Sequence, residues 1–274
     1  MIHKNRSLEA LFAPAEFTAL KGRDLRETVC VVFDVLRATS TMVTALANGA
    51  VAAIPVEEIA EALALRKRQP ELLLAGERNG VRIQAHLTGS IAFDLGNSPR
   101  EFTRERVGGR MMAMTTTNGT RALRACTQAK RVLIGSFLNL RATAEFVERE
   151  GSDQLLLVCS GTHDEAAYED VLAAGALCDL IWPRWNGSTI ADSAQMARRL
   201  YRLEQEDLPA AFGRSRNGRR LLGLPELRED VAYCAQRDVL DLVADLREDG
   251  KVRVIEVNRA KAEQRRFNCA PGTS

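Results

Sequence analysis

Side chains that bind soft metal ions are scarce in this sequence. It has three histidines, and its cysteines are scattered without a CxxC pair. Zinc clusters need closely spaced cysteine and histidine ligands, so the composition argues against one. Any metal would instead be a hard cation held by carboxylates, and Mg²⁺ fits that description. We expect most cysteines to be small buried hydrophobes in a reducing compartment: Cys30, Cys126, Cys159, Cys178, Cys234 and Cys269.

Long apolar runs and a dominant sign of charge are also missing. No stretch reaches the roughly 18 apolar residues that a membrane span requires, and the first residues lack the apolar run of a secretion signal. The formal net charge is +2, from 38 basic and 36 acidic residues, so we expect no general affinity for nucleic acid. The sequence predicts a cytoplasmic protein that binds neither nucleic acid nor membrane, with a homo-oligomer left open.

Short β-rich runs alternate with alanine-rich helical stretches along the chain. This alternation predicts an α/β fold: a three-layer α/β/α sandwich in which helices cover both faces of a mostly buried mixed sheet, within one domain of residues 1–274. Arginine-rich amphipathic segments follow one another from about 189 to 237 with no strand between them, which predicts a helical section. Its arginines could face a phosphorylated ligand, although most such runs are solvated helix faces.

The predicted strands are Thr28 to Phe33, Val51 to Val56, Leu72 to Ala75, Arg110 to Thr115, Arg131 to Gly135, Gln154 to Val158 and Val252 to Val257. The predicted helices are Ser40 to Ala47, Val56 to Arg68, Thr120 to Ala129, Leu140 to Arg149 and Asp170 to Ile181.

Three of these strands end in a turn crowded with Thr, Ser, Gly or Asn that leads directly into a helix. A helix start offers unpaired N–H groups and the positive end of the helix dipole, and hydroxyl side chains add donors. Ligands of open α/β sheets gather outside the carboxyl ends of the strands. The recurrence of this pattern therefore predicts a phosphate site built from several turns.

The first turn contains Asp34, Arg37 and the hydroxyls of Thr39, Ser40 and Thr41. An aspartate at the end of a strand can bind a cation or attack phosphorus, and Arg37 can hold phosphate oxygens through its fork of donors. The alternative is ordinary N-capping by Thr39 or Ser40, with Asp34 and Arg37 paired to each other.

The second turn, at residues 115–121, contains Thr115, Thr116, Thr117, Asn118, Gly119, Thr120 and Arg121. Asn118 and Gly119 can form a tight turn that brings backbone amides close to a ligand, with threonine hydroxyls and Arg121 nearby. A plain β-turn with an N-cap is the alternative. The GxxxxGK[ST] pattern of a Walker loop is absent.

The third turn contains Ser160, Gly161 and Thr162. Cysteine phosphatases would need an arginine where Glu165 stands, so a thiolate nucleophile at Cys159 is disfavoured. Asp170, at the head of the next helix, is either a helix N-terminal carboxylate or a metal ligand. Two further polar turns add Glu77 as a metal-ligand candidate and Asn97 and Ser98 as hydrogen-bond donors, with plain connecting loops as the alternative.

The segments DVLRATST, GERNG, FDxGNSP and TTNGT, between Asp34 and Thr120, resemble the 2-phosphosulfolactate phosphatase (ComB) family. A later CSG segment with Glu169 and Asp170, and EDVAYC followed by Asp238, extend the resemblance over nearly the whole chain. The resemblance implies an α/β/α fold and Mg²⁺-dependent hydrolysis of 2-phospho-3-sulfolactate, or a similar small phospho-acid, to sulfolactate and phosphate. That reaction is a step in coenzyme M biosynthesis.

For such an enzyme we expect Mg²⁺ to bind to Asp34, Glu77 and Asp170. The Thr39 and Thr117 turns, with Arg37, would hold phosphate, and the turn from Ser160 to Thr162 would face the acid end. Water is the default nucleophile. A phospho-Asp34 intermediate stays open, although Leu36 stands where DxDx[TV] phosphatases have their second aspartate.

Two other functions stay open at this point. A nucleotide-dependent phosphotransferase is disfavoured because Walker and dinucleotide glycine patterns are missing, and an ATP-binding titration would reveal one. A non-catalytic anion-binding protein would be excluded by phosphate release from a generic ester.

Overall fold

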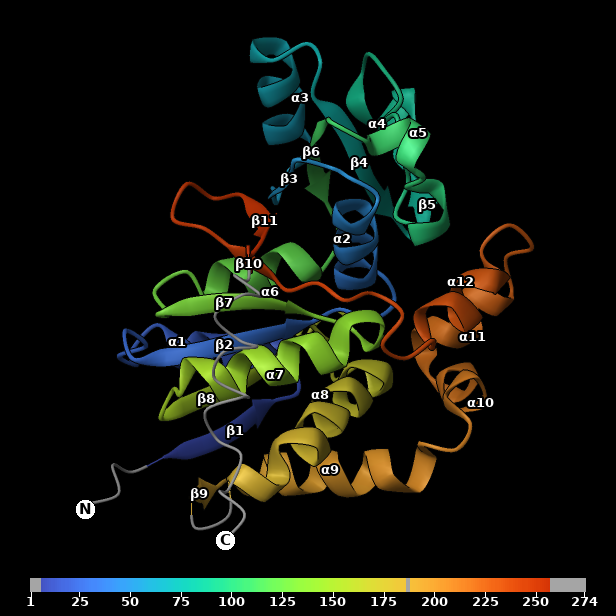
Figure 1. Cartoon of the computed structure of the whole chain (residues 1–274). Coiled ribbons are helices and arrows are strands. Elements are labelled where there is room, and N and C mark those ends of the chain that lie inside the picture. Colours follow the sequence, from blue (N-terminus) through green and yellow to red (C-terminus); the bar gives the residue numbers. More distant parts are fainter. Residues whose placement is uncertain (1–5, 186–187, 257–274) are drawn as a thin grey trace, which may run out of the picture.

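The computed structural model describes residues 6–185 and 188–256 (Figure 1). Its strands are β1 (Ser7–Leu11), β2 (Thr28–Phe33), β3 (Ala52–Pro55), β4 (Leu73–Arg78), β5 (Val81–Arg82), β6 (Met111–Thr115), β7 (Arg131–Gly135), β8 (Gln154–Cys159), β9 (Thr189–Ile190), β10 (Ala244–Leu246) and β11 (Val252–Val254). Its helices are α1 (Phe17–Leu20), α2 (Ala38–Ala47), α3 (Ile59–Arg68), α4 (Ala85–Thr88), α5 (Arg104–Val107), α6 (Gly119–Ala125), α7 (Leu140–Glu150), α8 (Tyr168–Ile181), α9 (Asp192–Glu204), α10 (Leu208–Arg214), α11 (Arg216–Leu222) and α12 (Arg228–Cys234).

Two parallel blocks make up the sheet, whose strand order is β5-β4-β6-β3-β11-β10-β7-β2-β8-β1-β9. Strands β4, β6 and β3 form one block, and β7, β2, β8 and β1 form the other. The hairpin of β10 and β11 lies between the blocks and pairs antiparallel with β7 on one side and with β3 on the other. The sheet is therefore mixed, as the sequence predicts.

Strand β2 shows why both faces of the sheet are covered. All six of its residues are buried. Val29, Val31 and Phe33 share a core with α7 and α8, whereas Cys30 and Val32 share one with α2 and α6. Because successive side chains of a strand point to opposite faces, helices cover both faces, and the predicted three-layer α/β/α arrangement is confirmed.

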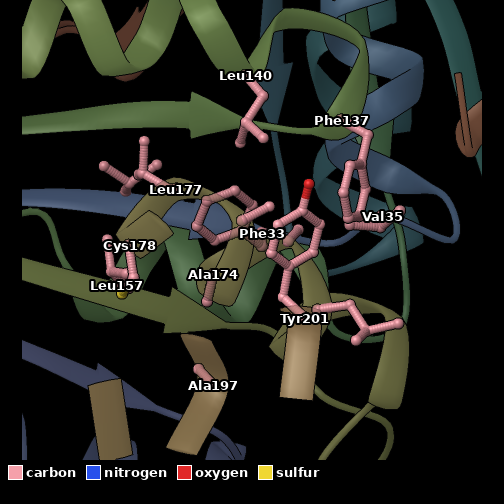
Figure 2. Packing of buried hydrophobic residues seen from close by; sticks show 14 of the residues in the cluster. Phe33, Val35, Phe137, Leu140, Leu157, Ala174, Leu177, Cys178, Ala197 and Tyr201 are labelled. Atoms are coloured by element: carbon pink, nitrogen blue, oxygen red, sulfur yellow. The ribbon is translucent and has the colours of Figure 1, made fainter. Parts of the chain in front are cut away.

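The core on the α7 and α8 side reaches into the helical section. Figure 2 shows Phe33 of β2 and Leu157 of β8 packed with Ala174 and Leu177 of α8, and with Tyr201 of α9. The Phe137 ring, which follows β7, lies 5.6 Å from the ring of Phe212 in α10 and 6.4 Å from that of Tyr201. Aromatic contacts of this kind add to apolar burial and hold α9 and α10 against the sheet layer.

The predicted helical section is present as α9 to α12, which stand together beside the sheet in Figure 1. The expectation that no strand falls between residues 189 and 237 is wrong, because the two-residue β9 pairs with β1. Its flanks are held by backbone hydrogen bonds from Thr189 to Arg6 at 2.8 Å and from Ala191 to Leu8 at 2.9 Å. Two residues are too short for an alternating pattern to show in the sequence.

The other sequence predictions match the elements closely. The predicted strands at 28–33 and 131–135 agree to the residue, whereas β1, β5 and β10 were not predicted. The strand predicted from Val252 ends at Val254, and residue 257 lies outside the described residues. The described cysteines are buried and free, as expected, and Cys269 lies outside the described part. No helix among residues 6–185 and 188–256 is long and apolar enough to cross a membrane.

Candidate active site

A pocket lies where the turns that follow β2, β4, β6 and β8 meet. The predicted site residues that line it are Asp34, Arg37, Glu77, Asn97, Thr117, Asn118, Gly161 and Thr162. Its other lining residues are Leu36, Asn79, Thr116, His163, Asn217, Arg220 and Leu221. The strand-end turns therefore come together, as the sequence pattern predicts.

Direct contacts join the three turns. The Asn118 side-chain amide donates to the carbonyl of Gly161 at 3.1 Å. Gly119 lies so close to Asp34 that a Cβ added there would stand 2.7 Å from Asp34 Oδ2. In the sheet, β6 is separated from β2 by β3, β11, β10 and β7, so the contacts between the two turns are made by loops beyond the strand ends.

Asp34 is the carboxylate that the first turn places at the pocket. Its backbone N–H donates to Thr39 Oγ1 at 3.0 Å, and its Oδ1 accepts from the Ala38 N–H at 3.0 Å. Burial raises the pKa of Asp34 to about 6, and the negative charges of Glu77 and Glu169 add to the rise. A buried carboxylate beside other carboxylates is stabilised in its charged form by a cation.

Arg37 lies almost fully buried beneath the pocket. Its Nη1 donates to Asp230 Oδ2 at 2.6 Å, and its Nη2 donates to the Gly80 carbonyl at 2.8 Å. Ser98, another predicted site residue, donates to the second oxygen of Asp230 at 2.6 Å. Arg37 is therefore paired with a residue of α12, not with Asp34, and it ties the first turn to the helical section and to the turn after β4.

Glu77 links the turn after β4 to the second predicted turn. Its Oε2 accepts from the Gly80 N–H at 2.6 Å. Its Oε1 accepts from the N–H and the hydroxyl of Thr117 at 3.1 and 3.0 Å. These bonds fix a second carboxylate in the pocket that Asp34 lines.

Asp170 does not line the pocket. It accepts hydrogen bonds from the Val35 N–H at 2.8 Å, the Gly161 N–H at 3.1 Å and the Ser160 hydroxyl at 3.2 Å. Burial raises the pKa of Asp170 well above its usual range, with the charges of Glu169 and Asp34 adding to the rise. Asp170 thus holds the first and third turns together, and its role as a metal ligand stays a prediction.

The remaining predicted site residues lie outside the pocket lining. Ser40 donates to the Val35 carbonyl at 2.9 Å, Thr41 to the Asn97 carbonyl at 2.8 Å and Thr120 to the Thr116 carbonyl at 3.3 Å. With Thr39, these hydroxyls hold the turns in shape. Arg121 forms an exposed ion pair with Asp164 at 3.4 Å. The roles of these hydroxyls and of Arg121 as substrate ligands stay predictions.

The pocket has an oxygen-rich lining that suits a hard cation. Besides Asp34 and Glu77, it is lined by Asn97 and Thr116, whose buried oxygens Oδ1 and Oγ1 have no hydrogen-bond partner among the described residues. The described chain holds no group of three or more His, Cys, Asp or Glu residues arranged for a metal. Mg²⁺ commonly uses one or two carboxylates together with water and substrate oxygens, so this set fits Mg²⁺.

Cys159 lacks the properties of a reactive thiol. It is fully buried, and burial raises the pKa of its thiol well above the usual range. A thiolate nucleophile needs a lowered pKa and access to substrate. The structure therefore supports the sequence argument against a thiolate nucleophile at Cys159.

Several lining residues were not among the sequence candidates. Asn79 lies within the GERNG segment and Thr116 within the second turn, so both could have been found there. For the arginine run that contains Arg220, the sequence left open a face toward a phosphorylated ligand beside a solvated face. His163 directly follows Thr162 of the third turn, whereas Asn217 carried no signal. The tertiary fold alone brings Asn217 to the pocket.

The pocket lies at the ends of the strands of an α/β fold, which is where such folds commonly bind small molecules. The family model described as 2-phosphosulpholactate phosphatase matches residues 17–249. The chain belongs to this family, which confirms the resemblance in its motifs and makes it a phosphoric monoester hydrolase.

Curated relatives agree with the family match over most of their length. A probable 2-phosphosulfolactate phosphatase of Caldicellulosiruptor saccharolyticus is 37% identical over 81% of this chain and 90% of its own. A second probable 2-phosphosulfolactate phosphatase, of Caldanaerobacter subterraneus subsp. tengcongensis, is 37% identical over 86% of this chain and 95% of its own. A third, of Thermotoga maritima, is 36% identical over 79% of this chain and 88% of its own.

Proposed function

We propose that the protein is a Mg²⁺-dependent phosphatase that hydrolyses 2-phospho-3-sulfolactate, or a similar small phospho-acid, to sulfolactate and phosphate. The observation that carries this proposal is one pocket at the meeting point of three hydroxyl- and amide-rich turns. It is lined by Asp34 and Glu77, and by Asn97 and Thr116, each with a buried oxygen that has no partner in the described part of the chain. Carboxylates for a cation and donors for an anion are the groups that phosphate-ester hydrolysis needs side by side.

Asp34 and Glu77 would hold the cation, with Asn97 Oδ1 and Thr116 Oγ1 as neutral oxygen donors beside them. When bound there, Mg²⁺ neutralises charge on the phosphoryl oxygens and so favours the transition state. The hydrogen bonds from Thr117 and Gly80 to Glu77, and from Ala38 to Asp34, orient the two carboxylates before the substrate arrives. Such preorganisation avoids a reorganisation cost during the reaction.

The anion-binding groups come from the second and third turns. Thr117, Asn118 and Thr162 line the pocket with hydroxyl and amide donors. Arg37 lies beneath them, and its hydrogen bonds go to Asp230 and Gly80. Because Asp230 balances its charge, its contribution to phosphate binding is mainly the shape that it gives to the turns.

Water is the nucleophile in this proposal, because Asp34 is needed for the cation and stands in a fixed hydrogen-bonded position. The alternative, a phospho-Asp34 intermediate, would appear as a phosphorylated protein by mass spectrometry after rapid acid quench. The water mechanism predicts no such species at any substrate concentration.

A phospho-acid panel tests the proposed function. Phosphate release is measured from 2-phospho-3-sulfolactate, 2-phospholactate and ATP, with Mg²⁺ and with excess chelator. We expect Mg²⁺-dependent release from the two phospho-acids, fastest from 2-phospho-3-sulfolactate. Full activity in chelator would contradict the metal, and preferred hydrolysis of ATP would contradict the substrate class.

A further inference from the structure

A second arginine lines the pocket, and its donors are available. Arg220 belongs to α11 in the helical section, and its side chain is exposed. It makes no hydrogen bond or ion pair with any residue that the structure describes. Arg37, in contrast, is bound to Asp230 and Gly80. Arg220 is thus the pocket arginine that can bind an incoming anion.

The helix that carries Arg220 is fixed against the pocket. Its N-cap Ser215 accepts from the Gly218 N–H at 2.9 Å. Asn217 donates to Thr162 Oγ1 at 2.8 Å and to Glu169 Oε1 at 2.6 Å. Residues three apart on a helix share a face, so Asn217 anchors the face of α11 from which Arg220 extends.

Gly80 allows the Arg220 guanidinium to approach the site closely. Its φ is +82°, and a Cβ added there would lie 3.1 Å from Arg220 Nη2 and 3.5 Å from its Nε. The N–H of the same residue donates to Glu77, and its carbonyl accepts from Arg37. Arg220 therefore stands beside the turn that positions one of the two pocket carboxylates.

Arg220 is the positive charge in the pocket lining that no described carboxylate balances. Asp34 and Glu77 are acidic, and the charge of Arg37 is balanced by Asp230 at 2.6 Å. A phospho-acid brings a carboxylate, or a carboxylate and a sulfonate, in addition to its phosphate. A guanidinium can bind two oxygens of either acid group through its planar fork of donors.

We propose that Arg220 binds the acid group of the substrate and thereby makes the enzyme select phospho-acids over phosphate esters that lack one. This inference rests on the proposed function and extends it to the helical section. The turn after β6 binds the phosphate end, whereas α11 and the turn after β8, which Asn217 joins to Thr162, recognise the rest of the molecule. The acid group is a carboxylate or a sulfonate, and the two are told apart by the test below.

Three esters that differ by one acid group at a time test this role. Isopropyl phosphate has no acid group, 2-phospholactate has a carboxylate, and 2-phospho-3-sulfolactate has a carboxylate and a sulfonate. The kcat/KM for each is measured with wild type, Arg220→Gln, Arg220→Lys and Arg219→Gln. Arg219 is the matched control, because it is an exposed arginine of the same helix that does not line the pocket.

We expect Arg220→Gln to lower kcat/KM for 2-phospho-3-sulfolactate by a factor at least about ten times larger than for isopropyl phosphate. A difference of this size corresponds to the loss of one charge-assisted hydrogen bond. Arg220→Lys should recover part of that selectivity, and Arg219→Gln should keep all of it. If the extra loss already appears with 2-phospholactate, Arg220 binds the carboxylate. If it appears only with 2-phospho-3-sulfolactate, Arg220 binds the sulfonate.

Equal losses on all three esters, or no loss on any, would overturn the assignment of Arg220 while leaving the proposed function intact. A wild-type protein that releases no phosphate from any of the three would overturn the proposed function, and this inference with it. Thermal melts of each variant show that the comparison is made between folded proteins. Arg220 has no intramolecular partner among the described residues to lose, so we expect unchanged melting.

Discussion

Arg37 Nη1 donates to Asp230 Oδ2 at 2.6 Å, and the side chains of both residues are almost completely buried. One residue follows β2 and the other belongs to α12, so this ion pair connects the first turn of the site to the helical section. Ser98 adds a hydrogen bond to the other oxygen of Asp230. A buried charge pair of this kind is costly to break, because the remaining charge cannot reach water.

Asp230→Asn should therefore destabilise the protein strongly. The neutral amide leaves the buried Arg37 guanidinium without a counter-charge, so we expect the free energy of unfolding to fall by about 3 to 5 kcal/mol. Denaturant titration measures the change. Asp249→Asn is the control, since it breaks an exposed ion pair with Arg253 and should leave the denaturation midpoint unchanged. Equal midpoints for both variants would contradict a structural role for the Asp230 pair.

Gly119→Ala should disturb the site through Asp34. The added Cβ would stand 2.7 Å from Asp34 Oδ2 and 2.8 Å from the Ala38 Cβ, so these atoms must move apart. Overpacking of this kind costs about 1 to 3 kcal/mol of stability, and we expect a larger than tenfold loss of kcat/KM.

Gly22→Ala is the matched control, because no atom of the described residues lies within 4 Å of its added Cβ. Phosphate release and thermal melting should stay at the wild-type values in this control. Wild-type turnover in Gly119→Ala would show that the approach of the second turn to Asp34 has no role in catalysis.

Asp170→Asn distinguishes a positioning role from a metal-binding role. Its carboxylate accepts from Val35, Ser160 and Gly161, and an amide can accept at only one of its two terminal atoms. We expect a loss of about 1 to 3 kcal/mol in stability and slower turnover, with the affinity for Mg²⁺ nearly preserved. Calorimetric titration with Mg²⁺ tests this, and a loss of affinity as large as in Asp34→Asn would make Asp170 a ligand.

The affinity for Mg²⁺ should depend on the protonation of Asp34. Burial raises the pKa of this carboxyl from 3.8 to about 6, and a metal binds the deprotonated form. Affinity should therefore be constant above that pKa and fall about tenfold per pH unit below it. Calorimetric titrations between about pH 5 and pH 8, with circular dichroism to confirm folding, measure the profile. A constant affinity down to pH 5 would contradict this role for Asp34.

The sequence predicted the strand-end turns well because their signal is local. Val29 to Phe33 is a continuous apolar run that Asp34 follows directly, and the second turn is indicated by the segment from Thr117 to Gly119. For Arg220 the sequence left both a ligand-facing and a solvated position open, since a helix carries the same arginine pattern whether its face meets solvent or a pocket. The partner of Arg37 was missed for a similar reason, because Asp230 lies far along the chain in another helix.

The shortest strands also could not be predicted from the sequence. β9 and β10 have two and three residues, too few for periodicity to separate them from loops. The hairpin of β10 and β11 joins the two parallel blocks through pairing between segments distant in sequence. The single domain of residues 1–274, the cytoplasmic location, a homo-oligomeric state and the absence of a nucleic-acid partner stay predictions.

The most direct measurement of the central claim is a Mg²⁺ titration of phosphate release from 2-phospho-3-sulfolactate by wild type, Asp34→Asn and Glu77→Gln, with Asp249→Asn as control. Each of the two pocket variants keeps the shape of a carboxylate that lines the pocket and removes its charge. We predict that wild type and the control respond to Mg²⁺ alike, and that both pocket variants lose at least about a hundredfold in turnover while remaining folded. Wild-type rate and Mg²⁺ dependence in either folded pocket variant would contradict the assignment of this pocket as the metal-dependent phosphatase site.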